Sequence, residues 1–207
     1  MHKPVNLKPA YKLTVYLLGL AGTCLGVSIC LKSTLGLDAW NAAMAGLSNL
    51  TPATFGQWTI LIQGSFWLIS SLIDKKARLL SILPILYKGI VLDAVQPLIE
   101  KISFGGSLIS DVLLFAAGYV IIGFATGVYI STGYPRMPID GLMLSLANAF
   151  HCDIKWSRLI IEITGFATMI AVHGAFGIGT VIITFTCGYM FSACRRFSER
   201  TIMKEMV

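Results

Sequence analysis

Residues 13–31 read LTVYLLGLAGTCLGVSICL, nineteen residues without a charged side chain. A helix rises about 1.5 Å per residue and a bilayer core is about 30 Å thick, so this run is long enough to cross a membrane. Of the 207 residues, 56% are apolar and 13% charged, and the mean hydropathy is +0.77; soluble domains carry about 25% charged residues. The composition therefore predicts an all-α polytopic membrane protein. It excludes a disordered chain, a typical soluble enzyme and a nucleic-acid-binding domain.

Long apolar runs predict six transmembrane helices. They cover residues 13–31, 55–73, 79–99, 112–130, 159–175 and 176–194. Two further segments, residues 38–50 and 138–150, have helix-forming sequence but would be only about 20 Å long. Each is therefore predicted to be a short re-entrant or interfacial helix rather than a span.

The basic residues predict the orientation of these spans. Six crossings place thirteen of the sixteen Lys and Arg residues on one face, with Lys32 and Lys101 on the other and Lys88 inside a span. Because cytoplasmic loops carry the excess of cations, both termini are predicted to be cytoplasmic. The same cations account for the pI near 9.1 without a nucleic-acid partner. The thirteen are Lys3, Lys8, Lys12, Lys75, Lys76, Arg78, Arg136, Lys155, Arg158, Arg195, Arg196, Arg200 and Lys204.

The two halves of the chain resemble each other. Residues 22–29 read GTCLGVSI and residues 123–130 read GFATGVYI, which share the pattern G-x-x-x-G-V-x-I. Both halves then repeat the order span, short helix, span, span. We therefore predict a first repeat over residues 1–106, a second over residues 107–197, and a cytoplasmic tail over residues 198–207. Three pairs of positions also correspond: Asp38 with Asp140, Gly64 with Gly165, and Gly89 with Gly188.

Three spans in each repeat make the second copy enter the membrane from the opposite face. The prediction is thus an inverted 3+3 repeat, an architecture found in secondary transporters, where the binding site lies near the midplane between repeats. The glycine pairs Gly22/Gly26 and Gly123/Gly127 are typical of close helix packing. We expect this packing within one chain first, and between chains of a homo-oligomer second.

Four short motifs resemble the YczE/YyaS-like family of bacterial integral membrane proteins. They are the G-x-x-x-G helix, Gly36-Leu-Asp-Ala-Trp40, Tyr134-Pro-Arg-Met-Pro-Ile-Asp-Gly141 and Gly177-Ile-Gly-Thr180. The resemblance would cover roughly residues 10–197. It implies the fold, a membrane location and a bacterial origin, and it supplies no catalytic residues.

Ionisable groups within spans are costly and are therefore candidates for function. The candidates here are Lys88, Asp93, Glu162 and His173. Lys88 is long enough to reach toward Glu162. Such a pair would either hold two helices together permanently or exchange partners with a proton or a charged solute.

Three further polar residues complete the candidate solute- or ion-binding set. Gln63 lies near the repeat counterpart of Glu162, where it would form an interhelical hydrogen bond or line a site. Asp38 and Asp140 each stand where a short helix would begin. Their simplest role is an N-cap, which accepts backbone N–H bonds.

Motifs for catalysis are lacking. The sequence has no G-x-S-x-G, H-E-x-x-H or Walker loop, and the five cysteines form no C-x-x-C pair. We therefore expect no enzyme activity, no cofactor and no metal. The sequence favours a small-solute transporter, or the membrane-embedded substrate-binding subunit of one with a separate energy-coupling partner. The alternative is a non-transporting scaffold or regulator of a membrane-associated enzyme complex.

Overall fold

The structure, a computed structural model, describes residues 9–103 and 106–201. Lys3, Lys8 and Lys204 and most of the predicted tail lie outside the described residues. Within the described ranges all regular elements are helical. In chain order they are α1 (Pro9–Lys32), α2 (Ala39–Leu50), α3 (Phe55–Asp74), the 3-10 turn η1 (Leu79–Ser81), α4 (Ile82–Glu100), α5 (Leu108–Ser131), α6 (Pro138–Ala149), α7 (Ile154–Ala171) and α8 (Ile178–Thr201).

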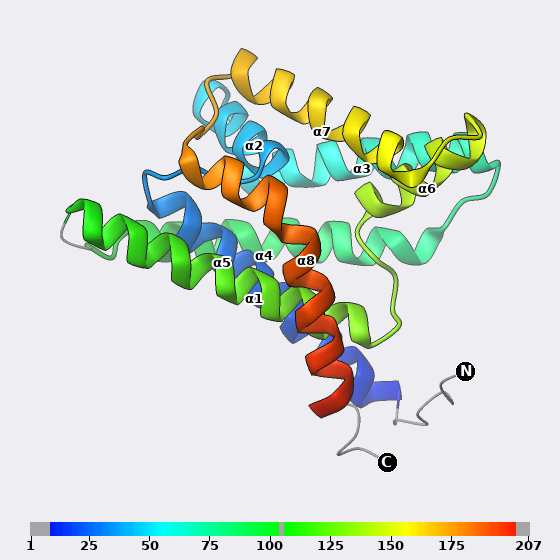
Figure 1. The fold of residues 1–207 in the computed structure, drawn as a ribbon, viewed down its shortest axis with the longest axis horizontal. Helices are drawn as coiled ribbons and strands as arrows, with labels where there is room; N and C mark the ends of the chain where they lie inside the picture. The colour runs from blue at the N-terminus through cyan, green and yellow to red at the C-terminus, as the bar shows by residue number, and fades with distance from the viewer. Residues whose placement is uncertain (1–8, 104–105, 202–207) are drawn as a thin grey trace.

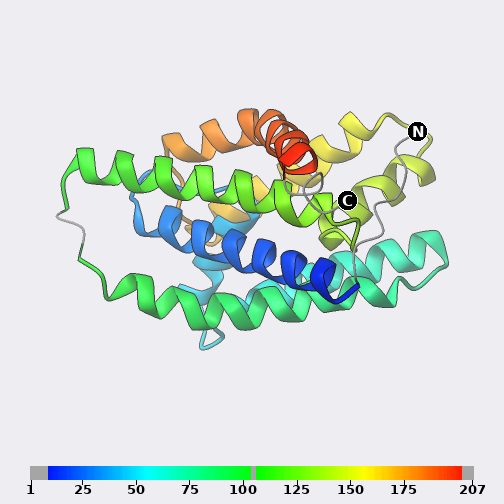
Figure 2. The ribbon, with the colours of Figure 1, turned by 90° about the horizontal axis from the view of Figure 1, so that it is seen from below.

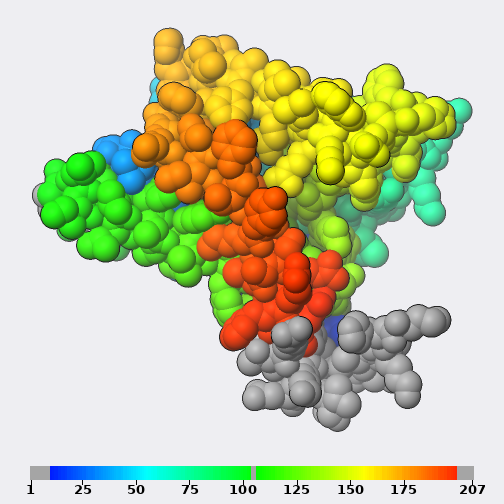
Figure 3. Space-filling view, in the orientation of Figure 1, coloured from blue at the N-terminus to red at the C-terminus, as the bar shows by residue number. Residues whose placement is uncertain are grey.

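The helices form two groups. The long helices α4, α1, α5 and α8 pack side by side in that order (Figures 1 and 2). The second group consists of α2, α3, α6 and α7. In it, α2 packs against α3 and α7, and α6 packs against the same two helices. In the space-filling view, α8 covers part of α5, and α7 forms the upper edge of the molecule (Figure 3). The α3–α4 contact connects the two groups, and Arg158 of α7 donates a hydrogen bond to the sulfur of Cys187 in α8 at 3.1 Å.

Four helices in the described ranges are long and apolar enough to cross a membrane. They are the four helices of the first group. Helices α3 and α7, which cover two of the six predicted spans, are not both long and apolar enough to be counted with them. The boundaries also differ, since α7 ends at Ala171 rather than at residue 175. Large apolar side chains cover the outer faces, such as Phe185 at 75% and Tyr189 at 83% exposed. Such surface is stable in lipid and not in water, so the chain is an integral membrane protein with several spans.

Small residues bring α1 and α5 together. A Cβ added at Gly22 would lie 2.9 Å from the Cβ of Ala125, and one at Gly26 would lie 2.7 Å from the carbonyl oxygen of Gly118. Gly127 plays the same part between α5 and α8, because its Cβ would lie 2.6 Å from the backbone of Cys194. The glycines therefore allow backbone-to-backbone packing inside one chain.

The short helices α2 and α6 begin differently. Asp38 is the N-cap of α2, and its carboxylate accepts a 3.1 Å hydrogen bond from the backbone N–H of Asn41. Helix α6 begins at Pro138, and its N-cap residue, Met137, makes no side-chain bond. Asp140 lies in the first turn instead. The N-cap expectation is thus confirmed for Asp38 and wrong for Asp140, because proline with its fixed φ already starts α6 two residues earlier.

The linkers at one end of the molecule are joined directly. The backbone N–H of Gly179 donates to Leu35 (2.7 Å), and that of Leu37 donates to Ala175 (3.3 Å). Gly36 has a φ of +97°, and a Cβ there would lie 2.6 Å from the backbone nitrogen of Gly177. Residues 33–38 and 173–179 therefore form what we call the sealed end.

Candidate functional site

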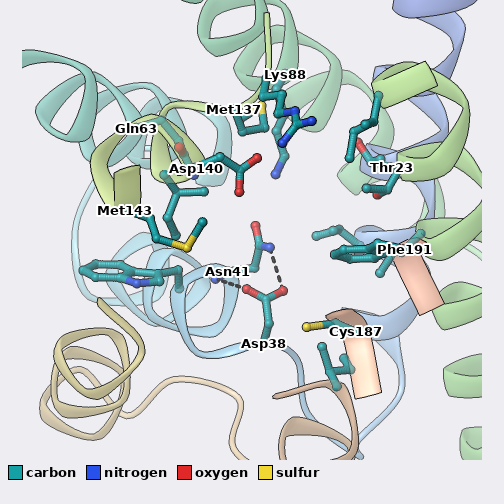
Figure 4. Close-up of a pocket in the computed structure, with 18 of the residues that line it drawn as sticks. Thr23, Asp38, Asn41, Gln63, Lys88, Met137, Asp140, Met143, Cys187 and Phe191 are labelled. Carbon is teal, nitrogen blue, oxygen red and sulfur yellow. Dashed lines mark hydrogen bonds between the residues drawn. The ribbon is translucent and has the colours of Figure 1, made fainter. Parts of the chain in front are cut away.

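A cavity of about 290 Å³ lies between the two groups of helices (Figure 4). Its lining comes from the α1–α2 linker, the α5–α6 linker and all eight α-helices, so segments from both halves of the chain meet there. The polar residues of the lining are Thr23, Asp38, Asn41, Gln63, Lys88, Thr126, Tyr129, Arg136, Asp140, Arg158, Glu162 and Cys187.

The cavity carries three cations, Lys88, Arg136 and Arg158, and three anions. The anions are Asp38, Asp140 and Glu162. The formal charges of the lining therefore cancel. What decides its chemistry is which of these groups are already paired with one another.

Lys88 is the buried cation of this site that has no partner in the described structure; Arg136 also has none, but its side chain is exposed. Lys88 is only 8% exposed, and its amine points into the cavity (Figure 4). Among the described residues, no carboxylate lies within 4.0 Å of that amine and no acceptor is hydrogen-bonded to it. Glu162, the expected partner, instead lies 3.9 Å from Arg158 in the same helix. The predicted pair is not formed because an arginine one turn earlier in α7 takes its place.

Two residues of the lining, Asn41 and Gln63, have a buried amide oxygen without a donor. The side-chain N–H of Asn41 donates to Asp38 (2.7 Å), which leaves the amide oxygen of Asn41 without a partner in the described structure. The amide oxygen of Gln63 is in the same state. Buried polar groups are hydrogen-bonded in the great majority of cases, so unpaired ones beside a cavity indicate a ligand or water there.

The carboxylate of Asp140 is the unpaired anion. Asp140 accepts no hydrogen bond from any described residue. Burial raises the pKa of Asp140 above its ordinary value, and the nearby cations Arg136 and Arg158 lower it in part. Asp38 differs, since two donors from Asn41 satisfy it. The two acids at the starts of α2 and α6 therefore have different chemistry.

A second cavity of about 710 Å³ lies beside the first. It is lined by the α3–α4 linker and by the segment that leads into α6. Arg136, Met137 and Asp140 line both cavities and thus stand between them. Within the described chain, no hydrogen bond joins residues 75–81 to residues 135–141. We call this part of the molecule the open end.

Five of the seven sequence candidates line the central cavity. They are Asp38, Gln63, Lys88, Asp140 and Glu162.

The other two candidates lie elsewhere. Asp93 accepts hydrogen bonds from Thr54 and from the backbone of Gly56, both at 2.7 Å, and so ties the start of α3 to α4. His173 is exposed in the α7–α8 linker.

Sequence reasoning missed three charged or amide-bearing residues of the cavity: Asn41, Arg136 and Arg158. Two of them carried a signal that helical spacing could have found. Asn41 is three residues after Asp38, and Arg158 is four residues before Glu162, so each shares a helical face with a candidate. Arg136 had no such signal, because it lies in a loop.

The chain is similar to bacterial proteins, one of which is described as a membrane protein. The family model described as "Family of unknown function (DUF6198)" matches residues 10–196. The chain is 27% identical to YyaS of Bacillus subtilis over 94% of this chain and 97% of that protein. It is 28% identical to YczE of the same organism, described as a membrane protein, over 84% of this chain and 81% of that protein. No solved structure gives a significant match.

Proposed function

The chain belongs to the Family of unknown function (DUF6198), and for this member we propose a role in binding a small solute within the membrane, as a carrier or as the substrate-binding subunit of one. The observation that carries the proposal is the unpaired amine of Lys88, which is buried and points into a cavity lined from both halves of the chain. An unpaired buried charge costs several kcal/mol. A protein that only holds helices together gains nothing from that cost, whereas a binding protein recovers it when the ligand arrives.

The proposal includes an inverted repeat of two halves, α1–α4 and α5–α8. Packing supports it, since three corresponding pairs of helices pack in both halves, whereas the α3–α4 contact has no counterpart of similar extent between α7 and α8. The pair α1–α4 corresponds to α5–α8, α2–α3 to α6–α7, and α2–α7 to α6–α3. Helices α1 and α5 pack against each other about the centre. A site at the interface of such halves is the arrangement used by secondary transporters.

The proposal also assigns a direction. By the positive-inside rule, the open end is cytoplasmic, because Lys75, Lys76, Arg78 and Arg136 lie in its linkers. The sealed end then faces outward. A carrier must close one end while the other is open, and the difference between the two ends supports this role over that of a static scaffold.

A thermal-unfolding screen of the full-length protein in detergent tests the proposal. The panel contains amino acids, vitamins, nucleobases, sugars and small organic acids. A solute at a hundred times its Kd should stabilise the protein by about 2.7 kcal/mol. The same panel is run with Lys88→Met, which keeps the length of the side chain and removes its charge, and with Lys101→Met, which makes the same change on the exposed surface.

We expect at least one solute to raise the Tm of the parent and of Lys101→Met, but not of a folded Lys88→Met protein. Uptake of that solute by proteoliposomes then identifies a carrier, and binding without uptake identifies a binding subunit. If no class of solute stabilises a well-folded parent, the proposal is wrong and the scaffold or regulator role takes its place.

A further inference from the structure

We propose that the central cavity takes a zwitterionic amino-carboxylate, a small molecule with one carboxylate, one ammonium group and an apolar remainder. This inference rests on the proposed function and names its substrate class. It follows from the unpaired groups on the inner wall of the cavity, which are one buried cation, one anion and two neutral acceptors; the further unpaired cation, Arg136, is exposed.

The carboxylate of the ligand pairs with Lys88. That amine is the buried cation without a partner in the described structure, whereas Arg158 already has Glu162 at 3.9 Å and the sulfur of Cys187 at 3.1 Å. A hydrogen bond between two charged groups is about twice as strong as a neutral one, and it restores the partner that Lys88 lacks.

The ammonium group of the ligand donates hydrogen bonds to unpaired acceptors of the cavity lining. The carboxylate of Asp140 receives no hydrogen bond, and the amide oxygens of Asn41 and Gln63 are buried without donors. In Figure 4 the side chains of Lys88, Asp140 and Asn41 all point into the same space. An ammonium group brings three N–H donors, which matches three waiting acceptors.

The charge balance favours a zwitterion over a simple ion. The three cations and three anions of the lining already cancel. A lone anion would satisfy Lys88 and add a net negative charge beside Asp140, and a lone cation would leave Lys88 unpaired. A molecule with both charges pairs each free group and adds no net charge in a place where charge is costly.

Size and lining limit the rest of the molecule. A volume of about 290 Å³ is at the small end of ligand pockets, which hold roughly 300–1,000 Å³. The remaining wall is apolar and includes Val27, Ile122, Met143, Ile183 and Phe191. The cavity therefore suits a neutral amino acid with an apolar side chain and not a large or polar one.

The test compares three matched ligands on the full-length protein in detergent. They are L-leucine, isoamylamine, which lacks the carboxylate, and 4-methylpentanoate, which lacks the ammonium group; L-methionine and L-phenylalanine extend the zwitterion set. Affinity is measured by thermal shift and by titration calorimetry. We expect at least one of the zwitterions to bind, and the compound that lacks either charge to bind about tenfold more weakly or worse, since one charged hydrogen bond is worth that much.

Variants assign each charge to its residue. Lys88→Met should reduce the affinity for the zwitterion and abolish the difference between leucine and isoamylamine, because no partner for the carboxylate remains. Asp140→Asn should abolish the difference between leucine and 4-methylpentanoate. Lys101→Met and Asp153→Asn are the matched surface controls and should bind like the parent.

The outcomes separate this inference from the proposed function. If a nucleobase, a sugar or an ion of one sign binds in a manner that depends on Lys88 while the amino acids do not, the substrate class is wrong and the binding role stands. If no member of any class binds, both are wrong.

Discussion

The two ends of this molecule differ in how their linkers meet, although the proposed repeat makes those linkers equivalent. At the sealed end, residues 33–38 and 173–179 share two backbone hydrogen bonds and touch through glycine. At the open end, residues 76–81 and 133–138 lie on the walls of a cavity of about 710 Å³. The same architecture is therefore held shut on one side and left apart on the other.

Two glycines, one in a linker at each end, show a structural cause of this difference. Gly36 and Gly133 both follow the first long helix of their half, and both have a positive φ, of +97° and +76°. A Cβ at Gly36 would lie within 2.6 Å of both Thr180 and Gly177, but one at Gly133 would meet nothing within 4 Å. The sealed end uses its glycine for close packing as well as for backbone shape, whereas the open end uses it for backbone shape alone.

Replacing Gly36 by alanine should have the largest effect. The left-handed backbone costs about 1–2 kcal/mol with a Cβ, and the clash with the Gly177 backbone costs about 1–3 kcal/mol more. Gly133→Ala should lower the free energy of unfolding only by the backbone cost, because no clash occurs there. Unfolding of both variants in detergent, followed by tryptophan fluorescence, measures the difference. Equal losses would show that the sealed end is not held by this contact.

The next effect comes from Asp38, which caps α2 next to the sealed end. Asp38→Ala removes two hydrogen bonds from Asn41, at 3.1 and 2.7 Å. Losing a cap costs about 1 kcal/mol, and losing hydrogen bonds to a charged group costs about 1.5–3 kcal/mol. We expect the free energy of unfolding to fall by about 2 kcal/mol. Asp153→Ala is the control, because that N-cap makes no side-chain bond in the structure; a similar loss there would contradict the assignment.

Replacing Asp140, the acidic residue in the first turn of α6, should raise the stability of the protein, whereas replacing Asp38 should lower it. The pKa of Asp140 in the folded protein is raised above its ordinary value of 3.8. The folded state therefore binds this proton more tightly than the unfolded state, and ionisation of Asp140 costs stability as the pH rises through the raised pKa. Without ligand, Asp140→Asn should be more stable than the parent at neutral pH. The gain should vanish as the pH falls toward 3.8, and Tm measured across that range tests the sign.

Much of this fold could be predicted from sequence because bilayers impose simple rules. Runs of apolar residues indicated the long helices, and their glycines indicated which faces pack. The starts of the short helices were harder. Asp38 caps its helix as predicted, but Pro138 starts α6 before Asp140 can do so.

The pairing within the cavity could not be predicted, because it depends on distances between helices. Glu162 has a cation on its own helix, Arg158, and that pair leaves Lys88 free. The length of a predicted span also says too little about how deep each of its residues lies in the membrane. Asp93 was counted among groups inside the membrane, yet its hydrogen bonds show that it secures the start of α3.

Arg136 should show the smallest effect on stability, and it tests whether the open end is held together at all. This exposed side chain lines both cavities and has no hydrogen-bond or ion-pair partner among the described residues. Exposed substitutions of that kind change stability by about 0.5 kcal/mol or less, so Arg136→Gln should lose only a small amount of stability, through the weaker stabilisation of the ionised Asp140 carboxylate. If it instead loses as much stability as Gly36→Ala, then Arg136 secures the open end as firmly as the glycine contact secures the sealed one. The contrast between the two ends would then be one of shape and not of strength.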